Sequence, residues 1–196
     1  MPLTQIDPVA ALVVIDLQKG IVGMPCGPHA TADVVKRSAE LAVEFRKRNL
    51  PVILVNVEGR APGRVDATMN FNPPAGWAEL VPELGRKPSD YTATKFQIGA
   101  FYGTALERIL RRAGVTQVFL TGVATTVGVE ATARQAYDLG FNVVIIEDAM
   151  SDMSADNHRH AMTAVYPRIA EVTTTADALG KLRATEPPGF HGVSID

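Results

Sequence analysis

The chain has 196 residues, of which 46% are hydrophobic and 20% are charged. This length suits one domain with a substantial core, and the composition is ordinary for a soluble globular protein. The net charge of −2 excludes the strong basic footprint of proteins that bind nucleic acid or anionic membranes. We expect neither a signal peptide nor a membrane span. The single cysteine, Cys26, excludes an internal disulfide and a cysteine-based metal site, so we expect a reducing compartment, the cytoplasm.

Short apolar runs alternate with longer amphipathic ones, which is the pattern of βαβ units around a parallel sheet. In chain order the sequence predicts a strand at 11–15, a helix at 32–48, a strand at 51–57, a long excursion at 59–89 with a short helix at 77–81, a strand at 91–94, a helix at 104–113, a strand at 117–120, a helix at 126–139, a strand at 142–146, a helix at 155–165, a strand at 168–172 and a helix at 176–183. The whole chain, 1–196, is expected to form one domain, with a loosely ordered tail from about residue 186.

The most informative stretch is VFLTGVATTVGVEATARQA at residues 118–136. It predicts a buried strand, a tight turn of small residues, and a helix whose first turn has backbone N–H groups available to an anion. The helix entrance, where a nucleophile would be mounted, holds Gly128. An anion cradle without a nucleophile suggests chemistry carried out by water and a separate acid/base pair, or no chemistry at all.

Two charged residues follow predicted strands at the edge where ligands of open α/β sheets bind. Asp16 ends the first strand after five apolar residues, and its alternative role is to cap the following turn. Lys95 follows the strand at 91–94, where it could hold Asp16 ionised or be an ordinary surface lysine. Gln18 can bind substrate or local backbone, and the sequence does not separate the two.

These pieces, in this order, resemble the isochorismatase-like hydrolases, a superfamily that includes nicotinamidases and N-carbamoylsarcosine amidases. The matching segments are VVIDLQ around Asp16, TKFQIGAF at Lys95, and LTGVATTVGVEATARQAYDLGFNVVIIEDAMSDM at 120–153. The resemblance covers residues 9–182. It implies a single-domain α/β fold, a three-layer α/β/α sandwich with a six-stranded parallel, Rossmann-like sheet, and a cis peptide at Val123–Ala124.

Most members of the superfamily use an Asp–Lys–Cys triad with a covalent intermediate. Asp16 and Lys95 match the first two positions, and Gly128 stands where the cysteine would be, so the covalent mechanism is excluded here. True isochorismatases resemble this chain in carrying glycine at that position, and they split a vinyl ether with the aspartate as general acid. They differ from it in having an aromatic residue at the position of Ala124 and a histidine at that of Thr126. The metal site of nicotinamidases is absent, because NVEGRAPGRVD contains no histidine.

Other candidates carry weaker signals. Cys26 lies in a loop and could act as a replacement thiol, but an ordinary loop cysteine is the simpler interpretation. His158 and His160 point to different faces of a helix and are expected to be surface or packing residues. Arg60 and Arg64 could bind a substrate carboxylate or be exposed loop arginines. Further candidates for a pocket wall or an inter-subunit contact are Trp77 and Phe71.

The sequence therefore predicts a hydrolase of a small, carboxylate-bearing molecule that works without a covalent nucleophile or a cofactor or metal. Asp16 is the acid/base, Lys95 its electrostatic partner, and Gly128 the bare nucleophile position. Substrate-binding roles are assigned to Gln18, Arg60, Ala124 and Thr125. A homo-oligomer, dimer or tetramer, is expected from the relatives, with no nucleic-acid or membrane partner. The alternative is a catalytically inactive homologue that binds a small molecule.

Overall fold

The computed structural model describes residues 3–66 and 72–185. Its six strands are β1 (Ala10–Ile15), β2 (Val52–Val57), β3 (Tyr91–Lys95), β4 (Gln117–Val123), β5 (Asn142–Ser151) and β6 (Glu171–Thr173). Its α-helices are α1 (Lys19–Val22), α2 (Thr31–Lys47), α3 (Leu106–Arg112), α4 (Glu130–Asp138), α5 (Ala155–His160) and α6 (Thr175–Ala184). Shorter helical turns are η1 (Pro82–Leu84), η2 (Thr125–Val129), η3 (Ala161–Val165) and η4 (Tyr166–Arg168).

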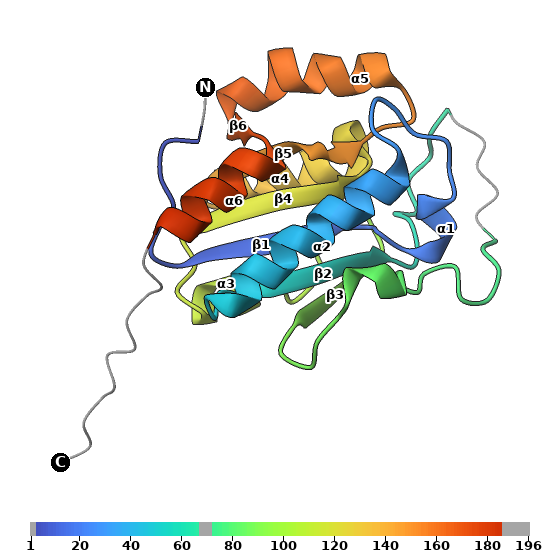
Figure 1. Ribbon diagram of the computed structural model, residues 1–196. Coiled ribbons are helices and arrows are strands. Elements are labelled where there is room, and N and C mark those ends of the chain that lie inside the picture. The colour runs from blue at the N-terminus through green and yellow to red at the C-terminus, as the bar shows by residue number, and fades with distance from the viewer. Residues whose placement is uncertain (1–2, 67–71, 186–196) are drawn as a thin grey trace.

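The strands form one parallel sheet in the order β3-β2-β1-β4-β5-β6. The chain builds outward from β1 to β3, then crosses back and builds outward on the other side from β4 to β6 (Figure 1). The direction of winding therefore changes between β1 and β4, and ligands of open α/β sheets bind beyond the carboxyl ends of the strands at such a point.

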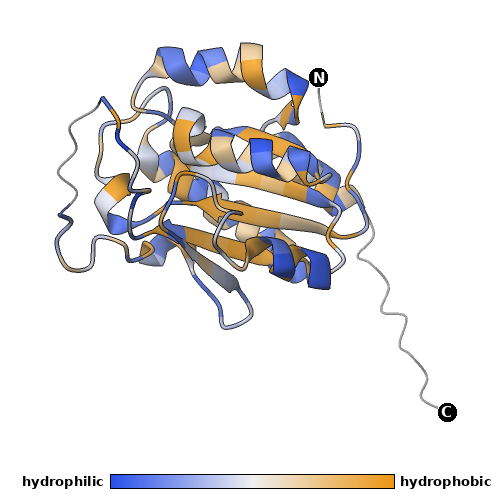
Figure 2. Cartoon of the chain, turned by 180° about the vertical axis from the view of Figure 1, so that it is seen from behind, coloured by the Kyte–Doolittle hydropathy of each residue, from blue (hydrophilic) through white to orange (hydrophobic). Residues whose placement is uncertain are grey.

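Helices cover both faces of the sheet, which gives the predicted three layers (Figure 1). Alternate residues of β1 face opposite ways: Leu12 and Val14 pack in the cluster that includes α2 and α6, and Val13 and Ile15 pack in the cluster that includes α3 and α4. The central strands β1, β2 and β4 are accordingly mostly hydrophobic, whereas the edge strand β3 is largely polar and the helices carry hydrophilic residues as well (Figure 2). Every residue of β1 is fully buried, which explains why its sequence is an unbroken apolar run.

The sequence predicts the fold class and the six strands correctly, and several local details differ. The expected helix at 77–81 is a turn at 75–78, followed by the short helix η1. The last strand lies at Glu171–Thr173 and not at 168–172, because Arg168, predicted as its first residue, belongs to the turn η4. β5 extends to Ser151, five residues beyond the prediction, and α1 was not predicted. The predicted helices at 126–139 and 155–165 each contain a π-helical turn. The tail from residue 186 lies outside the described residues.

Candidate active site

Asp16 and Lys95 form a buried ion pair at the carboxyl edge of the sheet. Asp16 follows directly after β1, and Lys95 is the last residue of β3, so Lys95 reaches past the end of β2, the strand between them. Lys95 Nζ lies 2.8 Å from Asp16 Oδ2. Asp16 is only 4% exposed and Lys95 2%, so the contact is shielded from water. The two residues predicted from separate segments of the sequence therefore meet.

The environment of Asp16 makes it easier to protonate than an ordinary aspartate. Burial raises the pKa of Asp16 to about 6, against the opposing attraction and hydrogen bond of Lys95. Oδ2 contacts Lys95, whereas Oδ1 is buried and has no hydrogen-bond partner in the described part of the chain. The residue also has a left-handed backbone conformation, with φ of 54°, which is uncommon outside glycine. A buried carboxyl with a pKa near neutrality and one unused oxygen is suited to proton transfer with a ligand.

Gly128 lies directly beside this pair. A Cβ added to Gly128 would lie 3.0 Å from Asp16 Oδ2 and 3.7 Å from Lys95 Nζ. It would also lie 3.1 Å from Cγ2 of Ile15. The absence of a side chain at position 128 thus brings the backbone of η2 close to the carboxylate, and it leaves no group there that could act as a nucleophile.

The bend between β4 and η2 carries the backbone over the end of β1. Gly122, near the end of β4, has φ of 122°, and a Cβ there would lie 2.0 Å from the carbonyl oxygen of Ile15. Only glycine fits this close approach. The peptide between Val123 and Ala124 is cis, as the resemblance implied. The bend therefore brings residues 124–128 into the neighbourhood of Asp16.

Comparisons with known proteins agree with this geometry. A family model described as the isochorismatase domain matches residues 10–177. The chain belongs to the isochorismatase family. It is 45% identical to the isochorismatase family protein YecD of Escherichia coli O157:H7 (88% of this chain, 95% of the relative). It is 41% identical to the isochorismatase family protein YwoC of Bacillus subtilis (88% of this chain, 94% of the relative).

A solved structure shows the same fold. An isochorismatase family protein from Burkholderia thailandensis superposes with a TM-score of 0.83 at 42% identity, covering 91% of this chain and 98% of the other. Members of this family are hydrolases, so the chain is an isochorismatase-family hydrolase of one α/β domain. The comparisons do not assign a role to Asp16, Lys95 or Gly128, whose roles stay predictions.

The sequence predicts an anion cradle built from the amides of residues 125–128, and the middle two of these amides are already engaged in hydrogen bonds. The N–H of Thr126 donates to Asp152 Oδ2 at 2.8 Å, and the N–H of Val127 donates to the carbonyl of Ala124 at 3.1 Å. Within the predicted range 125–128, a cradle would therefore rest on the amides of Thr125 and Gly128. Thr125 is fully buried and Ala124 is 9% exposed.

Gln18 serves the backbone. It is fully buried, its Nε2 donates to the carbonyl of Val57 at 3.0 Å and to that of Trp77 at 3.3 Å, and its Oε1 accepts from the N–H of Val57 at 2.8 Å. Both polar atoms of the side chain thus tie the end of β2 to the excursion. Of the two roles left open by the sequence, the structure shows the backbone role.

The remaining candidates lie in different settings. Arg60 and Arg64 are exposed in the excursion after β2, and a contact with substrate stays a prediction.

Burial raises the pKa of the Cys26 thiol and the charge of Asp152 raises it further, which lowers the thiolate fraction that a nucleophile needs. His158 is buried and His160 is exposed, as expected for residues on different helix faces. Trp77 packs against Gly20, and Phe71 lies outside the described residues.

Sequence reasoning missed two residues near the site, Asp152 and Tyr166. Asp152 follows β5 and is 2% exposed, and the Tyr166 hydroxyl donates to the carbonyl of Thr125 at 2.6 Å. A signal for Asp152 existed, because it is a carboxylate at the end of a parallel strand, but β5 was predicted to end five residues too early. No local pattern marks Tyr166, whose contact joins positions 41 residues apart.

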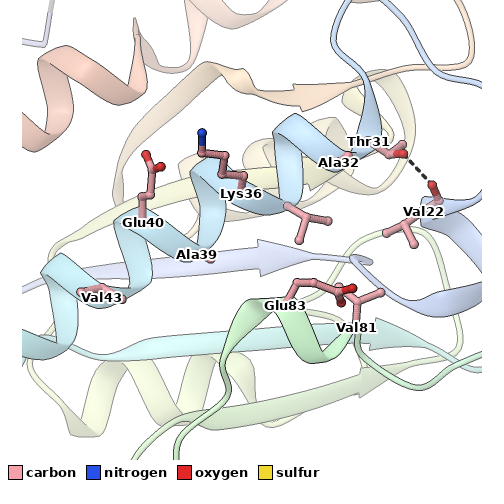
Figure 3. Close-up of a pocket in the computed structure, with 10 residues that line it drawn as sticks. Val22, Thr31, Ala32, Lys36, Ala39, Glu40, Val43, Val81 and Glu83 are labelled. Carbon is pink, nitrogen blue, oxygen red and sulfur yellow. Dashed lines mark hydrogen bonds between the residues drawn. The ribbon is translucent and has the colours of Figure 1, made fainter.

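An apolar cavity of about 540 Å³ lies along the outer side of α2, with Val22, Val35, Val43 and Val81 among its lining residues (Figure 3). The cavity wall includes none of Asp16, Lys95 and Gly128.

No cluster of three His, Cys, Asp or Glu side chains suited to a metal ion occurs in residues 3–66 and 72–185. In the same residues, no helix has the length and apolar character to cross a membrane.

Proposed function

We propose that this chain hydrolyses a small, carboxylate-bearing molecule without a covalent intermediate, with Asp16 as the acid/base and Lys95 as its electrostatic partner. The observation that carries the proposal is the water-shielded Asp16–Lys95 contact beside a position 128 that lacks a side chain. Charged groups are rarely buried unless they are paired, and desolvation opposes even a buried pair, so this pair is costly to maintain.

The charge distribution suits a reaction in which a proton is delivered and water then attacks. In its protonated form Asp16 can offer the proton of its unengaged oxygen to an enol ether carbon, and water adds to the resulting oxocarbenium carbon. The attacking water returns a proton to the carboxylate, and the hemiketal collapses to a carbonyl and an alcohol. Lys95 limits the rise of the pKa of Asp16 and stabilises its anionic form between the two proton transfers.

Binding of an anionic group would use the amides of Thr125 and Gly128, supported by an arginine from the excursion, Arg60 or Arg64. This assignment rests on the position of the turn next to the ion pair and on the exposure of both arginines on a segment that follows β2. A carboxylate-bearing vinyl ether or ester of low molecular mass is the substrate class that these groups fit.

The test is a turnover screen with small carboxylates that carry a vinyl ether, ester or amide bond, with products followed by mass spectrometry. For any compound that is turned over, we expect Asp16→Asn to lower kcat by about 10²–10⁴-fold, the usual contribution of general acid–base catalysis. If Asp16 donates the proton, the rate falls as the pH rises through about 6, because the carboxyl then becomes ionised. Unchanged turnover in Asp16→Asn would exclude this role.

The alternative is a binding protein that retains the site and performs no chemistry, and the glycine at position 128 is the observation that favours it. A compound that raises the melting temperature of the wild-type protein but not of Asp16→Asn, and that is never converted to product, would support this alternative.

A further inference from the structure

Three residues between the end of β5 and η4 form hydrogen bonds with the turn η2. Thr125 Oγ1 lies 2.8 Å from Nδ1 of His158 on α5, and the carbonyl of Thr125 accepts the hydroxyl of Tyr166. Thr126 donates both its N–H and its hydroxyl to Oδ2 of Asp152, at 2.8 and 2.7 Å. Three side chains from another part of the chain therefore fix two consecutive residues of the turn.

The side chains of Asp152, His158 and Tyr166 are all buried. Burial lowers the pKa of His158, and so does its neighbour His29, whose ring is 5.6 Å away, whereas Asp152 acts in the opposite direction. His158 is thus a neutral imidazole at pH 7. Burial raises the pKa of Tyr166, so its hydroxyl remains a donor. Asp152 also accepts from the N–H of Ser154 at 3.3 Å, which anchors its second oxygen.

The other side of the same turn faces the ion pair. The amides of Val127 and Val129 both donate to the carbonyl of Ala124, so the turn is closed on itself. Gly128 lies within this closed turn, and it is the residue whose added Cβ would come within 3.0 Å of Asp16 Oδ2. A displacement at Thr125 or Thr126 would therefore be transmitted to the backbone that covers the carboxylate.

We infer that Asp152 and His158 are positioning residues that hold the η2 turn against Asp16 and keep water away from its carboxyl group. This inference rests on the proposed function of Asp16. It explains how water is excluded from the carboxyl group that would act as the acid/base. Neither residue touches the reacting atoms. Each acts through a threonine hydroxyl, Asp152 through Thr126 and His158 through Thr125.

The proposal can be tested without a substrate, because the titration of Asp16 reports its hydration. Thr125→Val and Thr126→Val remove the two hydroxyl groups and change neither the charge nor the approximate volume of the side chains. If the turn loosens, water solvates the carboxylate and its pKa falls from about 6 toward the ordinary value of 3.8. We expect the double variant to lower the titration midpoint by at least about one unit, a tenfold change in proton affinity.

The measurement is a ¹³C NMR titration of side-chain carboxyl groups, in which the Asp16 resonance is identified by its loss in Asp16→Asn. Thr126→Ser keeps the hydroxyl and should retain the wild-type midpoint, which separates the hydrogen bond from the packing of the methyl group. The matched control is Thr116→Val, because the Thr116 hydroxyl donates to Asp7 at 2.7 Å, before the start of β4 at the opposite end of that strand. This control removes a threonine–aspartate hydrogen bond without touching η2, so the Asp16 midpoint should not move.

A wild-type midpoint retained in the double variant, with urea unfolding showing that it is folded, would overturn the inference. If the double variant does not fold, Thr126→Val alone decides by the same criterion. A shift in Thr116→Val as large as in the turn variants would also overturn it, since the effect would then be general loosening. These outcomes are independent of turnover. A compound screen that yields no product contradicts the proposed function, whereas the titration of Asp16 tests only the positioning role of Asp152 and His158.

Discussion

Replacing Lys95 by methionine should destabilise the protein in a pH-dependent way. The substitution keeps an unbranched side chain of similar length but removes the only charged group found within hydrogen-bonding distance of Asp16 among the described residues. What remains is a buried carboxyl whose desolvation is no longer offset. Its pKa should rise above 6, and the carboxyl should then stay protonated at neutral pH.

The size of the effect follows from proton linkage. A carboxyl whose pKa is raised on folding contributes stability that is fully present below its unfolded pKa, near 3.8, and is lost as the pH rises through its folded pKa. In the wild type this loss is complete just above pH 6 and amounts to about 3 kcal/mol, from roughly two pKa units at about 1.4 kcal/mol each. In Lys95→Met the loss continues above pH 6 at about 1.4 kcal/mol per pH unit. The part of the difference that comes from the ionisation of Asp16 should therefore grow from near zero at pH 5 to about 3 kcal/mol at pH 8, within the range for a broken buried ion pair.

Urea unfolding at pH 5, 6, 7 and 8 measures this difference, and groups that titrate equally in both proteins cancel from it. The matched control is the double variant Asp16→Asn/Lys95→Met, which contains neither charge and should show a difference from the wild type without the added slope above pH 6. If Lys95→Met loses the same free energy at all four pH values, the ionisation of Asp16 is not coupled to Lys95, and the reasoning about the site fails.

Two further predictions follow from local geometry. Gly122→Ala should lower the free energy of unfolding by more than about 4 kcal/mol or prevent folding, because its Cβ would lie 2.0 Å from the carbonyl oxygen of Ile15 at a φ of 122°. Urea unfolding measures the loss, and a value below about 1 kcal/mol would contradict the backbone geometry. Cys26→Ser should leave the turnover of any identified substrate unchanged, because the raised thiol pKa disfavours the thiolate; loss of turnover by more than tenfold would instead support Cys26 as the nucleophile.

The sheet could be predicted from the sequence because its inner strands are buried on both faces. A strand in that position is an unbroken run of apolar residues, many of them β-branched, as in residues 10–15 and 143–146, and it contrasts with the 3.6-residue period of α2. The ends were predicted less well. β5 continues past its apolar run through Glu147 and Asp148, two partly exposed residues that resemble the start of a loop.

The convergence of Asp16 and Lys95 could also be predicted, because parallel strands end at one edge of the sheet and both residues end a strand. The contacts behind the turn could not. His158 meets Thr125 across 33 positions and Asp152 meets Thr126 across 26, and such pairs depend on how α5 packs rather than on any local pattern. Gln18 shows the same limit: its sequence position fits a ligand contact, but Val57 at the end of β2 engages both of its polar atoms and Trp77 of the excursion accepts a second hydrogen bond from Nε2.

Several unfavourable features coincide at Asp16, and their coincidence is itself an argument for function. The residue has a left-handed backbone, a desolvated carboxylate and a buried oxygen without a partner, whereas the six residues of β1 before it form a regular, fully apolar strand. Each feature opposes folding, because strain and unpaired buried polar groups both lower stability. An asparagine would avoid the buried charge, and a glycine would avoid the strain. The chain follows local rules along the strand and departs from them at its end, and this departure supports the proposed acid/base role of Asp16.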